Sequence, residues 1–344
     1  MRNLVLGAGV GVVLSPLLLL WADSDIFLQS QFAFIGSLFA AYYLVILVHE
    51  LGHGAMAIAN GFEFRQLAVA PFLLTRMARG FQFRFLPGRI LSGGHLMAAP
   101  DSDRDLRRRY LRLLCGGPAA TLLMFLVLAL LPRNVFVFWL LVWNIIVAAT
   151  SWLPYYTQGL VTDAKGILLL TRPGPEADCL AALLFLVALD SQGKLPREWP
   201  PDVVAGLHAP GDTPLHARAK IFLLIYALDT GDSDAVAAAI ESALAAGAHQ
   251  SVDARRTCFS EAAFHHGVVR RDAAQARAWL EDARKIRGTA AEKGWDSAML
   301  GAIAFAEGNS ESARAAFTKA IERLDRRPKS GSVTAARARL AALL

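Results

Sequence analysis

A His-Glu-x-x-His pattern, formed by His49, Glu50 and His53, lies within an apolar stretch that runs from residue 31 to residue 59. On a helix, two histidines four residues apart project from one face and can both present a ring nitrogen to one Zn²⁺ ion. Glu50 would then lie beside the open coordination position, where it can orient a water molecule for attack on a peptide carbonyl. The pattern therefore predicts a zinc hydrolase site.

The same stretch is long enough to cross a bilayer, which makes its three ionisable side chains informative. A single histidine on an apolar helix is usually a hydrogen-bonded core residue, and a single glutamate is often simply paired. Three such groups close together in a membrane segment would each cost several kcal/mol if they faced lipid. A shared polar function explains them better than three separate structural roles.

Composition divides the chain into two parts. With 344 residues, 55% of them hydrophobic, and a mean hydropathy of +0.39, the chain is apolar for a soluble protein and polar for one that lies wholly in a membrane. Up to Arg172 there are 14 Lys and Arg against 8 Asp and Glu, whereas the remainder has 21 of each kind. The net charge of +6 belongs entirely to the first part, so a basic tail for nucleic acid is not expected and no nucleic-acid partner is predicted.

Four apolar runs have the length that a bilayer requires, namely residues 3–21, 32–58, 113–131 and 135–153. The segment from residue 60 to residue 112 holds ten arginines, whereas residues 22–31 hold none and residues 132–134 hold only Arg133. Because basic residues concentrate on the cytoplasmic side of membrane proteins, we expect both termini, the arginine-rich segment and everything after residue 153 to be cytoplasmic.

Between residues 61 and 100 the pattern changes from helical periodicity to alternation. Residues 62–65 and 81–85 place aromatic side chains on one face and polar side chains on the other, which is typical of half-buried strands. With an extended segment at residues 90–97, they predict a small cytoplasmic β-hairpin insertion. An exposed strand edge beside the zinc could bind an unwound substrate by strand addition, and a purely structural sheet is an equal alternative.

Beyond a Pro- and Gly-rich stretch at residues 171–175 the chain becomes alanine-rich and helical. Residues 176–190 are expected to lie along the membrane or to pack on the core. Three later stretches share apolar residues at i, i+4 and i+7: Val236, Ile240 and Ala243; Ala276, Leu280 and Ala283; Ala313, Phe317 and Ala320. This spacing is typical of a degenerate tetratricopeptide-type array, which binds peptides or proteins, and any alanine-rich helical bundle would give a similar pattern.

A catalytic zinc site uses three protein ligands, so the two histidines need a third from elsewhere in the membrane part. The candidates near the cytoplasmic helix ends are Asp163, His95, and the acidic cluster of Asp101, Asp103 and Asp105. The acidic cluster is better explained as a solvated loop, and His95 suits zinc but lies in a predicted strand. Asp163 follows residues 154–159, where Pro and Gly interrupt regular helix, and it could also be the solvated cap of a helix after a cytoplasmic turn.

Four blocks occur in order within about residues 31–170: HELGHG at 49–54, GGHL at 93–96, CGGPA at 115–119 and LPYYTQGLVTD at 153–163. In these blocks the chain resembles the site-2 protease family of intramembrane zinc metalloproteases. The resemblance implies a core of three membrane helices, with His49, His53 and Asp163 as zinc ligands and Glu50 as the general base. The chain departs from the family at Ser151 and Ala164, where the family commonly has Asn and Gly.

With that resemblance, the sequence predicts a mainly α protein. A polytopic membrane zinc metalloprotease domain spans residues 1–172, a linker with peripheral helices spans 173–230, and a tetratricopeptide-like helical domain spans 231–344. The expected activity is Zn²⁺-dependent hydrolysis of peptide bonds in membrane-embedded or membrane-adjacent protein substrates, near the cytoplasmic face of a bacterial inner membrane. The helical repeat domain is expected to bind a cytoplasmic protein partner.

Two alternatives to this function stay open. The protein could be a non-catalytic membrane adaptor that acts through its repeat domain, with a metal site that has become structural. It could also be a maturation protease for a small exported peptide, which keeps the chemistry and changes the substrate. The sequence identifies no substrate-binding residue and no cleavage site.

Overall fold

The computed structural model of the chain describes residues 31–77, 80–86, 93–102, 104–157, 161–286, 293–326 and 329–344. The first predicted membrane segment, residues 3–21, lies outside the described residues, as do Asp103 and Gly159. The described chain forms two compact units. One comprises the described residues of 31–155 and 161–173, and the other those of 156–157 and 174–344.

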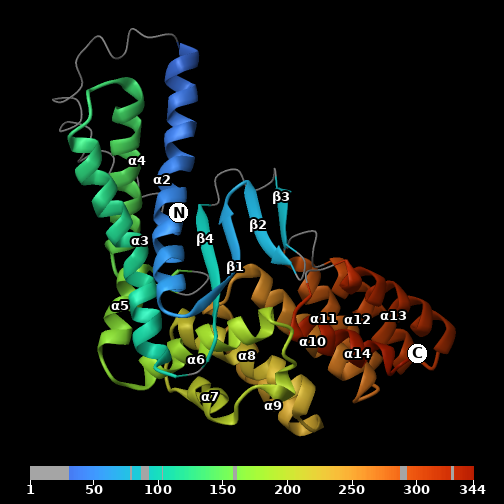
Figure 1. The fold of residues 1–344 in the computed structure, drawn as a ribbon. Coiled ribbons are helices and arrows are strands. Elements are labelled where there is room, and N and C mark those ends of the chain that lie inside the picture. Colours follow the sequence, from blue (N-terminus) through green and yellow to red (C-terminus); the bar gives the residue numbers. More distant parts are fainter. Residues whose placement is uncertain are drawn as a thin grey trace. The chain divides into compact units, whose positions relative to one another are not determined.

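Three long apolar helices dominate the first unit: α2 (Gln31–Ala59), α3 (Leu106–Ala129) and α4 (Val135–Trp152). Each is long and apolar enough to cross a membrane, in agreement with three of the four predicted segments. They run side by side in Figure 1. The second of these helices extends beyond the predicted apolar run of residues 113–131, because α3 begins at Leu106. The arginines at 107–109 and 112 therefore lie on a helix and not in a loop.

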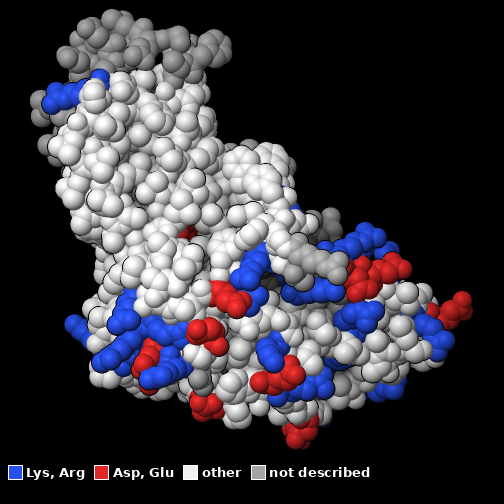
Figure 2. All heavy atoms as spheres, viewed as in Figure 1, with Lys and Arg blue, Asp and Glu red and all other residues white. Residues whose placement is uncertain are grey.

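The three helices bury one apolar face against one another and expose another. Their shared core is a cluster of Ala41, Val45, Leu128, Val137, Leu140 and Leu141. On α3, by contrast, Leu122, Leu123 and Leu126 are exposed. Figure 2 shows that the visible face of this column of helices is almost free of Lys, Arg, Asp and Glu between its two ends. Such an apolar surface suits lipid and would be unfavourable in water.

Glycines allow α2 and α3 to cross closely. A Cβ atom at Gly52 would clash with the backbone of Gly116, and a Cβ at Gly116 would clash with the backbone of Gly52. Small residues at a crossing let two membrane helices make extensive backbone contacts. This crossing lies within the His-Glu-x-x-His segment of α2, so it fixes which part of α3 covers that segment.

A four-stranded antiparallel sheet packs beside α2, and it is larger than the predicted hairpin. Its strands are β1 (Phe62–Val69), β2 (Phe72–Met77), β3 (Gly80–Phe85) and β4 (Gly94–Pro100), in the order β3-β2-β1-β4. The sequence analysis missed β2, whose residues, FLLTRM, do not alternate between apolar and polar. β4 is an edge strand that pairs with β1, and the register shifts between Phe64 and Gln66 of β1.

The prediction that β3 is half-buried is wrong. Phe81, Phe83 and Phe85 are 64%, 65% and 56% exposed, and every other residue of β3 is also exposed. The aromatic rings contact other rings of the same sheet, since Phe83 stacks on Phe72 with ring centroids 5.7 Å apart. The alternation of aromatic residues therefore arises from cross-strand pairs on one face of the sheet and not from burial in a core.

The helices of the second unit make up its regular secondary structure among the described residues, apart from a single bridge residue at Tyr156. Its longer helices are α6 (Pro175–Ser191), α8 (Pro214–Thr230), α9 (Ser233–Ala245), α10 (Val252–Val268), α11 (Ala273–Lys285), α12 (Lys293–Ala306), α13 (Ser310–Asp325) and α14 (Gly331–Ala341). The short elements are α7 (Pro201–Ala205) and three 3₁₀ helices, η3 (Pro196–Glu198), η4 (Gly206–His208) and η5 (Gly247–His249). Consecutive helices pack as pairs, α8 with α9, α10 with α11 and α12 with α13.

The predicted i, i+4, i+7 residues are the buried face of α9, α11 and α13. α6 contains the whole segment 176–190, which was expected to lie along the membrane or to pack on the core. It packs in the core of the second unit, with Leu180, Leu183 and Leu186 fully buried. Its end is joined to α14, because the backbone N–H of Ser332 donates to the carboxylate of Asp190 at 2.6 Å.

Candidate metal site

Three side chains with metal-binding atoms converge in the first unit. His49 and His53 lie one turn apart on α2, and Asp163 is the first residue of α5 (Asp163–Thr171). The Nε2 atom of His49 is 3.2 Å from one carboxylate oxygen of Asp163, and Nε2 of His53 is 3.4 Å from the other. Within the described part of the chain this is the one group of three or more His, Cys, Asp or Glu side chains whose ligand atoms lie within 4.8 Å of one another.

Hydrogen bonds fix both histidine rings with Nε2 turned toward Asp163. Thr121 uses its hydroxyl proton to bond the carbonyl of Gly117 at 2.9 Å, so its oxygen accepts a hydrogen bond from Nδ1 of His49 at 2.8 Å. Nδ1 of His53 donates to the carbonyl of Leu113 at 2.8 Å. Nδ1 of each ring is engaged on the side away from Asp163, so a metal ion could bind at both Nε2 atoms while the proton of each ring is on Nδ1.

Asp163 is held in place from both sides. The hydroxyl of Ser151, at the end of α4, donates to the Asp163 carboxylate at 2.6 Å. The preceding residue, Thr162, caps α5 and also donates to the carbonyl of Leu153 at 2.8 Å, which turns the chain back beside α4. At the other end of α5, Nε of Arg107 donates to the carbonyl of Leu170 at 2.7 Å. α5 is thereby tied to both α3 and α4.

The carboxylate of Asp163 is ionised in this environment. Burial raises the pKa of the Asp163 carboxyl, but the contacts with His49, His53 and Ser151 lower that pKa more strongly. The net result is a pKa well below the ordinary value of an aspartate. Asp163 is therefore an anionic group that could bind a metal together with the two histidines, and it is not the solvated helix cap that the sequence also allowed.

Gly117 leaves the space in front of the two histidines open. A Cβ atom at this position would clash with Nε2 of both His49 and His53, because α3 passes directly over them. A side chain at residue 117 would therefore occupy space next to both Nε2 atoms, which are the atoms that would bind an ion. A glycine is required here for the packing of α3 on α2 and for an accessible metal position at the same time.

Glu50 is buried next to this group and close to β4. Its exposed fraction is 7%, equal to that of His49. A Cβ atom at Gly94 of β4 would meet Oε1 of Glu50, and the backbone of Leu96 makes a hydrogen bond to the Glu50 side chain. The carboxylate is thus held between the metal-binding histidines and the edge strand of the sheet.

Those of the other predicted candidates for a third ligand that the structure describes do not join the group. His95 is exposed on β4, where its Nε2 lies 2.7 Å from Nε2 of Gln66. Asp101 is exposed and accepts a hydrogen bond from Arg109 at 2.6 Å, and Asp105 is exposed at the start of α3. Asp103, the third acidic residue of the cluster, lies outside the described residues.

The spacing of the three groups suits a tetrahedral ion. Zn²⁺ binds histidine nitrogen and carboxylate oxygen at about 2.0–2.2 Å, which places two ligand atoms of a tetrahedron roughly 3.3–3.6 Å apart. Each histidine nitrogen lies at about this distance from one carboxylate oxygen of Asp163: Nε2 of His49 is 3.2 Å from one oxygen and Nε2 of His53 is 3.4 Å from the other. Two imidazole nitrogens and one carboxylate oxygen are also the donor set that zinc uses in hydrolases, with a fourth position for water.

An apolar groove of about 400 Å³ lies beside the site. It is formed by α3, the end of α4 and α5, and its lining includes Pro118, Trp152, Pro154, Ala164 and Leu168. Two of its lining residues, Pro118 and Ala164, directly follow Gly117 and Asp163 in the chain. Ala164 contributes only a methyl group to this lining.

Sequence reasoning missed the residues that orient the site. Thr121 was not singled out, although it lies one helical turn after Gly117, and Leu113 contributes only a backbone carbonyl, which no sequence pattern marks. Ser151 was identified as a departure from a family pattern, and the structure shows that its hydroxyl contacts Asp163. Gly117 appeared only as part of a matching block.

Comparison with known proteins supplies one match. The family model described as peptidase family M50 matches residues 37–324, which is most of the chain and includes His49, Glu50, His53 and Asp163. Among curated proteins and solved structures, none matches the chain significantly.

Proposed function

The chain belongs to peptidase family M50, whose members are membrane metalloproteases, and on that premise we propose that it is an intramembrane zinc endopeptidase. Its substrates in this proposal are membrane-embedded or membrane-adjacent proteins, cleaved near the cytoplasmic face. The observation that carries the proposal is the convergence of His49, His53 and Asp163 beside the buried Glu50.

Zn²⁺ is the ion that fits this donor set best. Nε2 of His49, Nε2 of His53 and one oxygen of Asp163 would hold it, in the space that Gly117 leaves open. When bound, zinc polarises the substrate carbonyl and lowers the pKa of water. Thr121 and the Leu113 carbonyl keep the rings in the ligand tautomer, and Ser151 fixes the carboxylate.

Glu50 acts as the general base in this mechanism. Its carboxylate accepts a proton from the attacking water while the water oxygen forms a bond to the carbonyl carbon of the substrate. The same carboxyl group then gives that proton to the leaving nitrogen, and the C–N bond breaks. Burial between α2 and β4 holds the carboxylate at one place, so that a single group can serve both steps.

The substrate would bind in an extended form along the edge of β4. A peptide bond inside a helix is shielded from attack, whereas an added strand presents its carbonyls in a regular row. β4 pairs only with β1 among the described strands, and it approaches Glu50 through Gly94. The groove beside Asp163 would accept an apolar side chain of the substrate, as expected for a membrane segment.

The orientation and the second unit complete the proposal. The arginines at 104, 107–109 and 112 lie at the end of the helix pair α2–α3. By the positive-inside rule this end would face the cytoplasm, in a protein of the bacterial inner membrane. The helix pairs of the second unit, α8 to α13, would form a tetratricopeptide-like surface that recruits a cytoplasmic protein.

The decisive experiment uses purified full-length protein with Glu50→Gln and, as a matched control, Glu63→Gln, whose side chain is largely exposed on β1. Membrane fragments from cells that carry native protein or Glu50→Ala, compared by proteomics, supply the candidate substrates. Glu50→Gln should lose hydrolysis by about a hundredfold or more while bound zinc stays near one per chain. Cleavage at the native rate by Glu50→Gln would favour the non-catalytic adaptor, because the observed proteolysis would then belong to a contaminant.

A further inference from the structure

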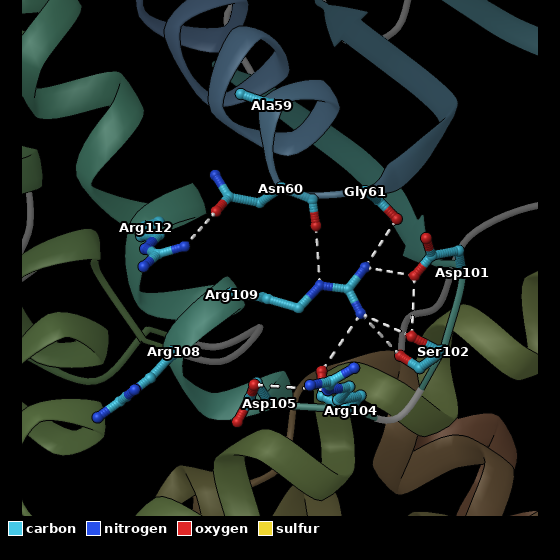
Figure 3. Close-up of a pocket in the computed structure, with 10 residues that line it drawn as sticks. All are labelled: Ala59, Asn60, Gly61, Asp101, Ser102, Arg104, Asp105, Arg108, Arg109 and Arg112. Carbon is cyan, nitrogen blue, oxygen red and sulfur yellow. Dashed lines mark hydrogen bonds and ion pairs between the residues drawn. The ribbon is translucent and has the colours of Figure 1, made fainter.

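A second cavity, of about 370 Å³, lies away from the metal site at the end of α2. Its walls come from the last residues of α2 and the turn into β1, from the residues after β4, and from the first two turns of α3. In Figure 3 Arg109 and Arg112 extend from α3 toward Asn60 and Gly61, and Arg104 comes from the preceding turn. Arg108 also lines the cavity, but its side chain extends from α3 away from the other lining side chains. The cavity is thus lined by four arginines, and none of them has a role in the proposed hydrolysis.

Arg109 holds the walls of this cavity together. Its guanidinium donates to the carbonyls of Asn60 and Gly61, at 2.8 and 2.7 Å, and to the carbonyl of Ser102 at 3.0 Å. It also forms an ion pair with Asp101 at 2.6 Å. In Figure 3 these bonds radiate from a central Arg109, so its donors are used within the protein and its charge is matched by Asp101.

The other three arginines keep most of their donors for a ligand. Arg112 donates to the side-chain oxygen of Asn60 at 3.1 Å, and Arg104 lies 4.0 Å from the carboxylate of Asp105. Arg108 forms no ion pair and no hydrogen bond with any residue in the described ranges, and its side chain is exposed. Arg108 and Arg112 are one helical turn apart on α3 and both line the cavity. The lining has four arginines and two carboxylates, those of Asp101 and Asp105, so positive charge is in excess.

The cavity lies at the depth of lipid headgroups. The apolar run of α3 starts at Leu113, directly after Arg112, and the apolar helix α2 ends at Ala59, which also lines the cavity. Both helices are candidate membrane spans by length and composition, so their adjoining ends would lie near the boundary between hydrocarbon and water. The negatively charged group that is abundant at this boundary is the phosphate of anionic phospholipids.

We propose that this cavity is a binding site for the phosphate headgroup of an anionic phospholipid, held by Arg108 and Arg112 with help from Arg104. Guanidinium groups bind phosphate oxygens in a bidentate manner, and two of them one turn apart can bind the same phosphate. The bound headgroup would link the end of α2, the helix that carries His49 and His53, to the start of α3. A lipid in this site would therefore stabilise the helix pair that forms the metal site.

The test uses the full-length protein in a neutral detergent, with dioleoyl phosphatidylglycerol as the probe and dioleoyl phosphatidylcholine as the zwitterionic reference. Native mass spectrometry measures the occupancy of each lipid, and the melting temperature is recorded with and without lipid. The native protein should bind one phosphatidylglycerol in preference to phosphatidylcholine and should melt at a higher temperature with it. The Arg108→Gln/Arg112→Gln variant should bind phosphatidylglycerol about thirtyfold more weakly, from roughly 1 kcal/mol for each arginine.

Two further variants separate the site from general charge and from misfolding. Arg84→Gln/Arg133→Gln removes the same number of charges from β3 and from the loop between α3 and α4, and it should bind phosphatidylglycerol as the native protein does. Arg108→Glu changes an exposed residue with no bond to lose among the described residues, so it should fold normally and still bind poorly. A zinc content near one ion per chain, measured for each variant, would show that the variant is folded.

Three outcomes would overturn the proposal. The first is native affinity for phosphatidylglycerol in Arg108→Gln/Arg112→Gln and in Arg108→Glu. The second is an equal loss of binding in the Arg84→Gln/Arg133→Gln control, which would indicate a diffuse charge effect. The third is displacement of the lipid by millimolar inorganic phosphate with no loss of melting temperature, which would mean that the cavity binds free phosphate and not a lipid.

Discussion

Replacing Thr121 by valine should weaken zinc binding without changing any residue that contacts the metal. Thr121 is only 2% exposed, and its oxygen accepts the hydrogen bond that keeps the proton of His49 on Nδ1. Valine has almost the same shape but cannot accept this bond. The ring must then keep a buried, unpaired N–H, at a cost of about 1–3 kcal/mol, or move the proton to Nε2 and lose the lone pair that binds metal.

The expected effect is a loss of about 10- to 100-fold in zinc affinity, as is usual when a group that orients a metal ligand is removed. This corresponds to about 1.4–2.7 kcal/mol, which agrees with the cost of one unpaired buried donor. The assay is competition for zinc between the purified full-length protein and a chromophoric chelator of known affinity. Thr150→Val is the matched control, because Thr150 bonds only to carbonyls of its own helix, α4, and is exposed.

The reasoning would be refuted by a Thr121→Val protein that binds zinc within about twofold of the native affinity. In that case the orientation of His49 would come from packing alone, and the hydrogen bond would have no energetic role. An equal loss in Thr150→Val would also count against it, since the effect would then reflect a general change in the membrane helices.

Three other changes test the same site. Ser151→Ala removes the hydroxyl that donates to Asp163, so zinc affinity and the rate of hydrolysis should both fall by roughly tenfold. Ser151→Asn again has a donor at this position, and a zinc titration beside Ser151→Ala should show that it recovers part of the loss. Gly117→Ala places a methyl group against both Nε2 atoms, so elemental analysis should find less than one zinc per chain. The control Gly36→Ala, at a position on α2 with open space, should bind zinc normally. Full zinc content in Gly117→Ala would contradict the assigned metal position. Asp163→Ala should lose both zinc and activity, whereas His95→Ala should retain the metal. The opposite pair of results would mean that His95 on β4, and not Asp163, is the third ligand.

The elements that carry the site were accessible from the sequence because they depend on local pattern. An apolar run of membrane length predicts a helix wherever it occurs, and α2, α3 and α4 follow from such runs. The pairing of His49 with His53 is likewise local, since four residues on a helix always bring two side chains to one face. The buried faces of α9, α11 and α13 were predicted for the same reason, from spacing within single helices.

The sheet shows where local pattern is misleading. The alternating aromatic residues of β3 predicted a strand correctly but predicted burial wrongly, because burial depends on what packs against the strand. β2 was missed, since its residues do not alternate and only its pairing with β1 and β3 makes it a strand. Side-chain alternation thus indicates extended backbone, and the neighbouring strands decide the rest.

The sequence by itself determined the chemistry of this protein, namely two histidines and a glutamate at fixed spacing on a membrane helix. Tertiary structure decided which residues complete that chemistry. Asp163 was one of several candidate ligands until the turn after α4 brought it to the histidines, and Thr121 is separated from His49 by more than seventy residues. The physical reason is that a metal site needs atoms within a few ångströms of one another, and such distances between segments far apart in the chain are set by helix crossings such as that of Gly52 with Gly116.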